Sequence, residues 1–199
     1  MDGSKWLVPR LPDFHKHCPD IDIRLQTSSQ VVDLPARTVD LAIRYGQGHY
    51  PGLEVYRLMT DEFTPVCSPR LRAGNHPLIQ PSDLAYHSLL HFEWANYGLE
   101  APNWKNWLAL AQVKTLEPDR GLKFDDENLA IQSAIAGQGV ALCSSIHVAN
   151  DMALGFLAKP FDIALPGLTY AAVYMKKHPK EAAILKFAEW LIEQAQAFH

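Results

Sequence analysis

The chain has 199 residues, of which 48% are apolar and 20% are charged, and its formal net charge is −4. These values are typical of a soluble globular protein with one domain or two small lobes. The chain does not have the excess of lysine and arginine that is typical of a nucleic-acid-binding module. No apolar stretch approaches the length of about 18 residues that a membrane-spanning helix needs. The first residues do not resemble a signal peptide. The three scattered cysteines contain no CxxC motif, which favours a reducing cytoplasm over a disulfide framework.

The N-terminal part of the chain predicts a helix followed by extended segments. Apolar residues recur at helical spacing between Lys5 and Cys18, and Pro9 and Pro19 set the expected start and end of that helix. Alternation of apolar and polar residues predicts a half-exposed strand at Ile21–Gln26. After it we expect a short helix at 32–37, a strand at 39–45, and two extended runs at 53–59 and 63–67.

A proline-rich segment, Ser68–Pro81, interrupts this pattern and predicts a connection between two lobes. The second lobe is expected to begin with a short helix at 81–86, a strand at 88–92 and a helix at 104–111. A helix near 147–154 and a strand at 168–174 follow, and this strand is expected to lead back to the first lobe. The clearest amphipathic helix covers Glu181–Phe198.

Residues Leu122–Ser145 read as one strand–helix–strand unit. Apolar strands are expected at 122–124 and 140–143, and a helix at 129–136 is closed by Gly137 and Gly139. This order predicts two parallel strands joined by a crossover helix. Ligands of such sheets bind where strands end and helices begin, so the polar turn Asp125–Asn128 is the first candidate site.

Other polar groups also follow predicted strands. Thr27, Ser28 and Ser29 supply hydroxyls that suit a small anion or carboxylate, and the phenols of Tyr45 and Tyr170 lie near strand ends. Each has a structural alternative. Hydroxyls and carboxylates at these places also cap helices, and tyrosines are often buried with their hydroxyls hydrogen-bonded.

The sequence contains no recognisable catalytic or metal-binding motif. It has no nucleophile elbow, zinc-protease motif, Walker loop or dinucleotide-binding glycine motif. His15 and His17 would point to different faces of a helix, so we interpret them as an exposed helix end. Cys67 and Cys143 lie in apolar runs, and we expect both to be buried.

Five stretches of the sequence stand in a characteristic order and spacing: KWLVPRLPDFHKHCPDIDIRL at 5–25, VDLAIRYGQGHYPGLEVYRL at 39–58, PVCSPRL at 65–71, HPLIQPSDLAYHSLLH at 76–91 and FDDENLAIQSAIAGQGVAL at 124–142. Through them the chain resembles the effector-binding domain of a LysR-type transcriptional regulator, in the branch of the glycine-cleavage activator and the β-lactamase regulator. These stretches span nearly the whole chain.

The resemblance implies an α/β fold of two Rossmann-like lobes, similar to a type 2 periplasmic binding protein, with the effector in the cleft. Lobe one would comprise 1–70 plus 170–199, and lobe two 71–169. The implied effector contacts are Thr27, Ser28, Ser29, Asp125, Glu127 and Tyr170, and we add Tyr45 and Ser68. Close relatives often carry serine where this chain has Glu127, which favours a cationic or amino-bearing effector.

Two departures from the family pattern are visible. The chain contains neither a helix-turn-helix domain nor a linker helix, so we expect DNA contact only through a domain that is not part of it. The family's first strand normally precedes the Ser4–Leu7 region, but this chain starts at Met1 without it. An unfilled sheet position exposes strand edges, so we expect self-association.

These observations predict a cytoplasmic effector-sensing domain without enzymatic activity, metal or cofactor. Its expected partners are a small-molecule effector, amino-acid-like or derived from the cell wall, and further copies of itself in a homodimer or tetramer. Two alternatives remain at this point. One is a free-standing solute-binding receptor of the same fold, and the other is an enzyme built on this scaffold.

Overall fold

The computed structural model describes residues 4–27, 34, 39–93 and 101–198. The chain divides into two compact units: unit 1 comprises Met1–Asp61 and Leu168–His199, and unit 2 comprises Glu62–Gly167. The chain passes between the units inside two long strands, β2 (Leu53–Cys67) and β6 (Leu165–Met175). The first passage therefore falls at Asp61 and not at residue 70, because the composition break marks the end of β2 and not the border of a unit.

Unit 1 begins with three short helical segments and ends with a long helix. The first three are α1 (Ser4–Leu7), η1 (Val8–Arg10) and α2 (Leu11–His17), and the last is α7 (Glu181–Gln196). Pro9 lies in the first turn of η1 and Pro12 in the first turn of α2, where a missing N–H costs no hydrogen bond. Helical structure thus begins one turn before Pro9, earlier than predicted.

The sheet part of unit 1 contains β1 (Ala42–Gly46), which pairs antiparallel with β6. The predicted strand at Ile21–Gln26 is wrong, since residues 21–27 form no β-ladder. A strand exists only where its backbone finds a hydrogen-bonding partner, whatever the alternation of its side chains. The helix expected at 32–37 lies outside the described residues, apart from Leu34.

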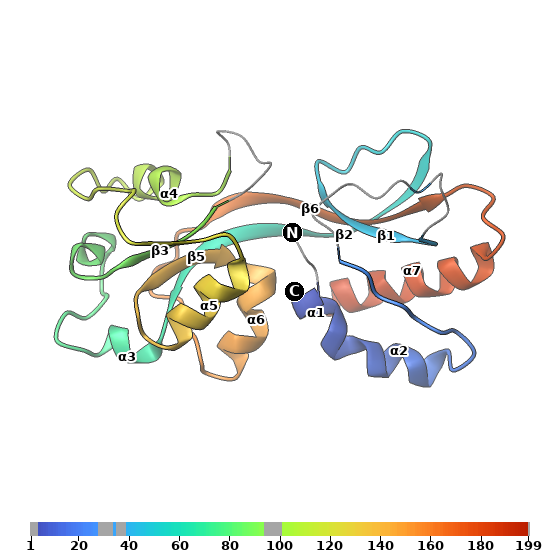
Figure 1. Ribbon diagram of the computed structural model, residues 1–199, viewed down its shortest axis with the longest axis horizontal. Helices are drawn as coiled ribbons and strands as arrows, with labels where there is room; N and C mark the ends of the chain where they lie inside the picture. Colours follow the sequence, from blue (N-terminus) through green and yellow to red (C-terminus); the bar gives the residue numbers. More distant parts are fainter. Residues whose placement is uncertain (1–3, 28–33, 35–38, 94–100, 199) are drawn as a thin grey trace. The chain divides into compact units, whose positions relative to one another are not determined.

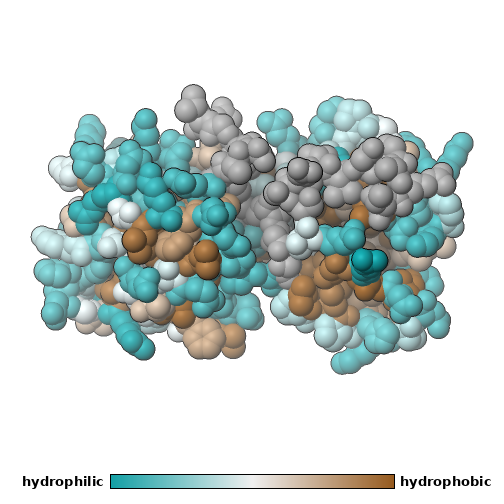
Figure 2. All heavy atoms as spheres, viewed as in Figure 1, coloured by the Kyte–Doolittle hydropathy of each residue, from teal (hydrophilic) through white to brown (hydrophobic). Residues whose placement is uncertain are grey.

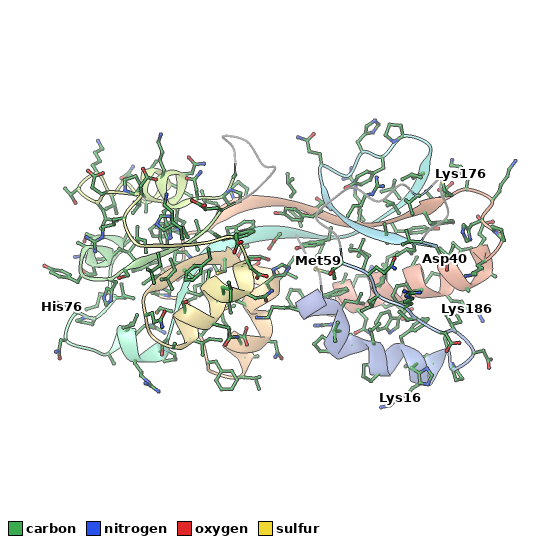
Figure 3. All side chains as sticks on the ribbon, viewed as in Figure 1. Lys16, Asp40, Met59, His76, Lys176 and Lys186 are labelled. Carbon is green, nitrogen blue, oxygen red and sulfur yellow. The ribbon has the colours of Figure 1, made fainter. Side chains whose placement is uncertain are left out.

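An aromatic cluster joins α2 to α7. The ring of Phe14 lies 4.9 Å from Phe187 and 5.2 Å from Trp190, centroid to centroid. The indole N–H of Trp190 donates to Asp13 Oδ2 at 3.0 Å, so the buried ring also has a polar partner. Lys16 points away from this cluster into solvent (Figure 3). The two helices therefore pack through one apolar face each.

Unit 2 contains a mixed sheet in the order β2-β5-β3-β4. β3 (Leu89–Phe92) pairs parallel with both β4 (Leu122–Phe124) and β5 (Val140–Ser144), whereas β2 pairs antiparallel with β5. The predicted parallel arrangement of the two strands in Leu122–Ser145 is thus confirmed, with β3 inserted between them. Every residue of β5 is buried, as expected for a central strand with both faces covered.

Helices cover the sheet of unit 2 (Figure 1). The longer ones are α4 (Trp104–Leu110), α5 (Glu127–Ile135) and α6 (Ser145–Ala153), and the short segments are α3 (Pro69–Arg72) and η2 (Pro81–Tyr86). Ile131 and Val148 pack with strand residues such as Ala141 in one buried cluster. The indole N–H groups of Trp104 and Trp107 donate to backbone carbonyls of residues 90 and 163, at 3.0 and 2.9 Å, which anchors α4.

The surface shown in Figure 2 is mainly hydrophilic, with separate hydrophobic areas. Among the residues that the structure describes, the most exposed large apolar side chain is Ile79, at 77%, followed by Tyr86 and Leu154. Among the described residues, no helix is both long enough and apolar enough to span a bilayer.

Candidate functional site

The predicted polar turn connects β4 to α5, and its residues have different roles. Asp126 is the N-cap of α5, and its Oδ1 accepts a hydrogen bond from the Asn128 N–H at 2.7 Å. Capping, the structural alternative for this turn, therefore applies to Asp126. Asp125, directly before it, is exposed to solvent and carries a carboxylate that a ligand can reach.

Glu127 is the first residue of α5, and its carboxylate is held inside the protein. Oε1 accepts a hydrogen bond from the Ser144 backbone N–H at 2.9 Å, and Oε2 lies 2.6 Å from His147 Nδ1. Only 7% of Glu127 and 5% of His147 are exposed. Both oxygens of the carboxylate are thus paired with groups of the β5–α6 turn. An ionised carboxylate in this geometry requires a proton on Nδ1.

Ser144 links this pair to the start of α6. It is the N-cap of the helix, and its Oγ accepts a hydrogen bond from the His147 N–H at 3.3 Å. In a capping box, the third helical residue is acidic and accepts a hydrogen bond from the N-cap N–H. Here that residue is His147, and Glu127 from α5 accepts the bond instead. Glu127 therefore completes the cap of a helix to which it does not belong.

These groups gather at one edge of the unit 2 sheet. β4 and β5 are both parallel to β3, so their carboxyl ends lie at the same edge, and the β4–α5 and β5–α6 turns both start there. In α/β sheets with parallel strands, this edge is where ligands bind. The turn with Asp125 and Glu127 therefore starts at this edge of the unit 2 sheet.

Ser68 lies elsewhere in unit 2. In the antiparallel pairing of β2 with β5, Phe63 is opposite Ser144, whereas Cys67 is opposite Val140 at the other end of β5. The Ser68 N–H donates to the Ala134 carbonyl at 3.1 Å, near the C-terminus of α5. A helix of nine residues is about 13 Å long. The structure therefore does not bring Ser68 together with Glu127.

The predicted residues of unit 1 include a tyrosine pair. Tyr45 in β1 is directly opposite Tyr170 in β6, and their ring centroids are 4.8 Å apart. The Tyr45 hydroxyl accepts a hydrogen bond from the Leu168 N–H at 2.9 Å. Tyr170 is buried, so burial, the structural alternative, applies to it. Thr27 is exposed, and Ser28 and Ser29 lie outside the described residues.

A shallow recess of about 310 Å³ in unit 1 is lined by Arg57, Leu58, Met59, Thr60 and Thr169. The Thr60 and Thr169 hydroxyls are 3.3 Å apart and share a hydrogen bond. Thr169 directly precedes Tyr170 in β6, so the two side chains lie on opposite faces of the strand and Tyr170 does not line the recess. Hydroxyls and a guanidinium group at its wall are groups that orient a polar ligand.

Sequence reasoning missed Ser144 and His147 as members of the unit 2 site. One signal was present, because a serine directly after an apolar strand is a typical helix N-cap. No spacing rule connects His147 to Glu127, however, since the two are 20 positions apart and meet only through the pairing of strands.

The burial of the two strand cysteines and the exposure of the histidines at the helix end agree with the predictions from sequence. Cys67 and Cys143 are both fully buried, and burial raises the pKa of the Cys67 thiol to about 11. His17 lies at the end of α2, where its Nδ1 donates to the Asp13 carbonyl at 2.8 Å. In the part of the chain that the structure describes, no three His, Cys, Asp or Glu side chains gather to hold a metal ion.

Comparison with known proteins identifies the family. The model of the LysR substrate binding domain matches residues 3–196. The glycine cleavage system transcriptional activator of Escherichia coli K12 is 35% identical over 195 residues, covering 96% of this chain and 61% of the activator. The activator AmpR of Providencia stuartii is 35% identical over 193 residues, covering 96% of this chain and 62% of AmpR. The chain thus spans less than two thirds of these relatives.

A solved structure supports the same conclusion. The effector domain of the regulator AmpR of Pseudomonas aeruginosa superimposes with a TM-score of 0.76 and 31% identity, covering 99% of this chain and 93% of that domain. Because the family model, the regulators and this fold all match along nearly the full chain, the protein belongs to the LysR substrate-binding domain family, the effector-binding domains of LysR-type transcriptional regulators.

Proposed function

We propose that this chain senses a small-molecule effector within a LysR-type transcriptional regulator. The observation that carries the proposal is the family match over residues 3–196, together with relatives that are transcriptional activators. An effector that binds two conformations of the domain with different affinity shifts the population between them. In the whole regulator this shift would change how the protein acts on DNA.

The proposed effector contacts are the predicted residues of each unit. In unit 1, Tyr170 is proposed together with Tyr45, whose ring it contacts across the β1–β6 pairing. In unit 2, Asp125 is supported by its exposure at the carboxyl edge of the sheet. Glu127 is already paired with Ser144 and His147, so we propose that it affects the effector through the position of its turn.

The exposed Asp125 carboxylate favours an effector with an amino group, because an opposite charge stabilises an ammonium ion at such a place. We therefore propose an amino-acid-like effector or an amino-bearing cell-wall fragment. Association with further copies of the chain, a cytoplasmic location and the absence of catalysis complete the proposal. They are supported by the regulators to which the chain is related.

A ligand screen tests this proposal. Thermal unfolding of the domain is followed with glycine, other amino acids and soluble cell-wall fragments, and any compound that raises Tm is titrated by calorimetry. Asp125→Asn and Tyr170→Phe are compared with Asp119→Asn, which removes an exposed carboxylate from a different loop. We expect at least tenfold weaker binding for Asp125→Asn, about the effect of one charge-assisted hydrogen bond.

Two outcomes would count against the proposal. If no amino acid or cell-wall fragment binds, the effector class is wrong. If a compound binds Asp125→Asn and Tyr170→Phe as tightly as it binds the wild type, the effector is bound by other residues.

A further inference from the structure

We infer that the start of α6 forms a carboxylate-binding position, and that Glu127 fills it as a resident carboxylate. The position consists of the Ser144 backbone N–H and the His147 imidazole. The Ser144 N–H donates to Oε1 of Glu127, and the imidazole donates to Oε2. This inference goes beyond effector sensing and does not depend on the identity of the effector.

The two donors are directed at the two oxygens of the Glu127 carboxylate. The Ser144 N–H lies 2.9 Å from Oε1, and His147 Nδ1 lies 2.6 Å from Oε2. Two donors directed at the two oxygens of one carboxylate form a bidentate arrangement, which is strong and specific for this group. Both donors belong to the β5–α6 turn, whereas the acceptor, Glu127, belongs to α5. A substitution of Glu127 therefore leaves both donors in place.

Both donors are buried. Ser144 is completely buried, and His147 is 5% exposed, so neither donor can turn to bulk water if the carboxylate is lost. A buried donor without an acceptor costs about 1–3 kcal/mol in proteins. The Ser144 hydroxyl is engaged with the His147 N–H and keeps the turn in the same conformation. The position is therefore preformed for a carboxylate.

The third residue of α6 is His147, where a capping box would have an acidic residue. An acidic residue there would satisfy the N-cap N–H from within the helix. His147 provides a second donor instead, so the turn needs an acceptor from outside α6. The N-terminal end of a helix also favours negative charge, and α6 has nine residues. Donor, burial and helix dipole all select an anion.

This arrangement has a consequence for specificity. While Glu127 occupies the position, a carboxylate of a ligand cannot bind there. Removal of the Glu127 side chain beyond Cβ leaves the donors in place and frees a space that formate or acetate can enter.

Chemical rescue tests the inference. Thermal unfolding of Glu127→Ala is measured in sodium formate, sodium acetate and sodium chloride of equal ionic strength. We expect Glu127→Ala to melt below the wild type in chloride and to recover saturably in formate. A ligand at about twenty times its Kd raises the Tm of a protein of this size by roughly 4–7 °C. The wild type should melt equally in formate and chloride.

Two control variants separate this site from general salt effects. Glu127→Ala/His147→Ala lacks the imidazole donor and should lose most of the formate effect. Glu181→Ala removes a carboxylate from the first residue of α7, where it is half-exposed, and should show no difference between formate and chloride. Equal melting of Glu127→Ala in formate and chloride overturns the inference, as does an undiminished formate effect in the double variant.

If Glu127→Ala does not fold in chloride, refolding provides the readout. The unfolded variant is dialysed into formate or chloride, and the folded fraction is measured by circular dichroism. A larger folded fraction in formate supports the resident-carboxylate inference, and the same fraction in both salts overturns it.

Discussion

Replacement of His147 by alanine tests whether the Glu127–His147 pair is an energetically coupled buried ion pair. The variant leaves Glu127 Oε2 without its partner at 2.6 Å, in a side chain that is only 7% exposed. Removal of one member of a buried pair costs about 3–5 kcal/mol, because the other charge remains buried and uncompensated. We therefore expect His147→Ala to lose about 3–5 kcal/mol of unfolding free energy.

A second variant shows how much of this loss comes from charge. Glu127→Gln keeps the shape of the side chain, and its amide oxygen still accepts the Ser144 N–H. In that background no carboxylate remains to be stranded, so His147→Ala should cost only about 1–2 kcal/mol, mainly a neutral hydrogen bond and lost packing. The two single variants and the double variant then give a coupling energy of at least about 1 kcal/mol.

The assay is urea unfolding followed by far-UV circular dichroism, with wild type, His147→Ala, Glu127→Gln and the double variant under identical conditions. The unfolding slope of the four proteins should agree, so that midpoint differences report stability. Additive effects, with a coupling energy below about 0.5 kcal/mol, would refute the idea of a coupled buried pair.

Three further outcomes are expected. Gly121→Ala should fail to fold or melt far lower, because its Cβ would collide with the backbone of β3. Gly155→Ala, also at positive φ but with open space around it, should lose only about 1 kcal/mol of unfolding free energy. Equal melting of the two variants would contradict this. Trp190→Phe should lose about 1 kcal/mol in urea unfolding, since it keeps most of the aromatic cluster but not the bond to Asp13; an unchanged midpoint would show that this bond contributes nothing. The Cys67 thiol should resist a thiol reagent at pH 8 in the native protein and react in urea, because burial raises its pKa to about 11.

The strongly periodic elements were predictable from sequence. In α7, the expected inward positions Ile184, Ala188, Leu191 and Ala195 are buried, and the other two, Phe187 and Phe198, are half-buried. A stripe along a helix of four turns leaves one solution for its packing. The short run 140–143 was correctly assigned to a strand, since it lies between glycines and a cap and is too short for a helix.

Elements that depend on distant partners were harder to predict. Ile21–Gln26 has the alternation of a strand but no ladder, and alternation alone cannot supply hydrogen-bonding partners. The runs 53–59 and 63–67 belong to one strand, β2, although polar residues separate them. One of these, Asp61, is buried in the middle of β2, so backbone pairing continues through a position that the hydrophobic pattern marks as a break.

The unit 2 site was half predictable. A polar turn after an apolar strand pointed to Asp125 and Glu127, and the sheet topology agrees with that prediction. The pairing of Glu127 with His147 was not predictable, because it requires β4 and β5 to flank β3 in parallel and so to end at the same edge of the sheet. Side-chain partners of this kind are set by tertiary structure and not by spacing along the chain.

The division of the chain also fixes an order of events during synthesis. Unit 2 is one continuous insertion, Glu62–Gly167, whereas unit 1 is assembled from both ends of the sequence. A ribosome therefore translates the whole of unit 2 before it reaches Tyr170 in β6 and Trp190 in α7, which belong to unit 1. Until then β1 lacks its antiparallel partner, so unit 1 is completed only after the sequence of unit 2 has been made.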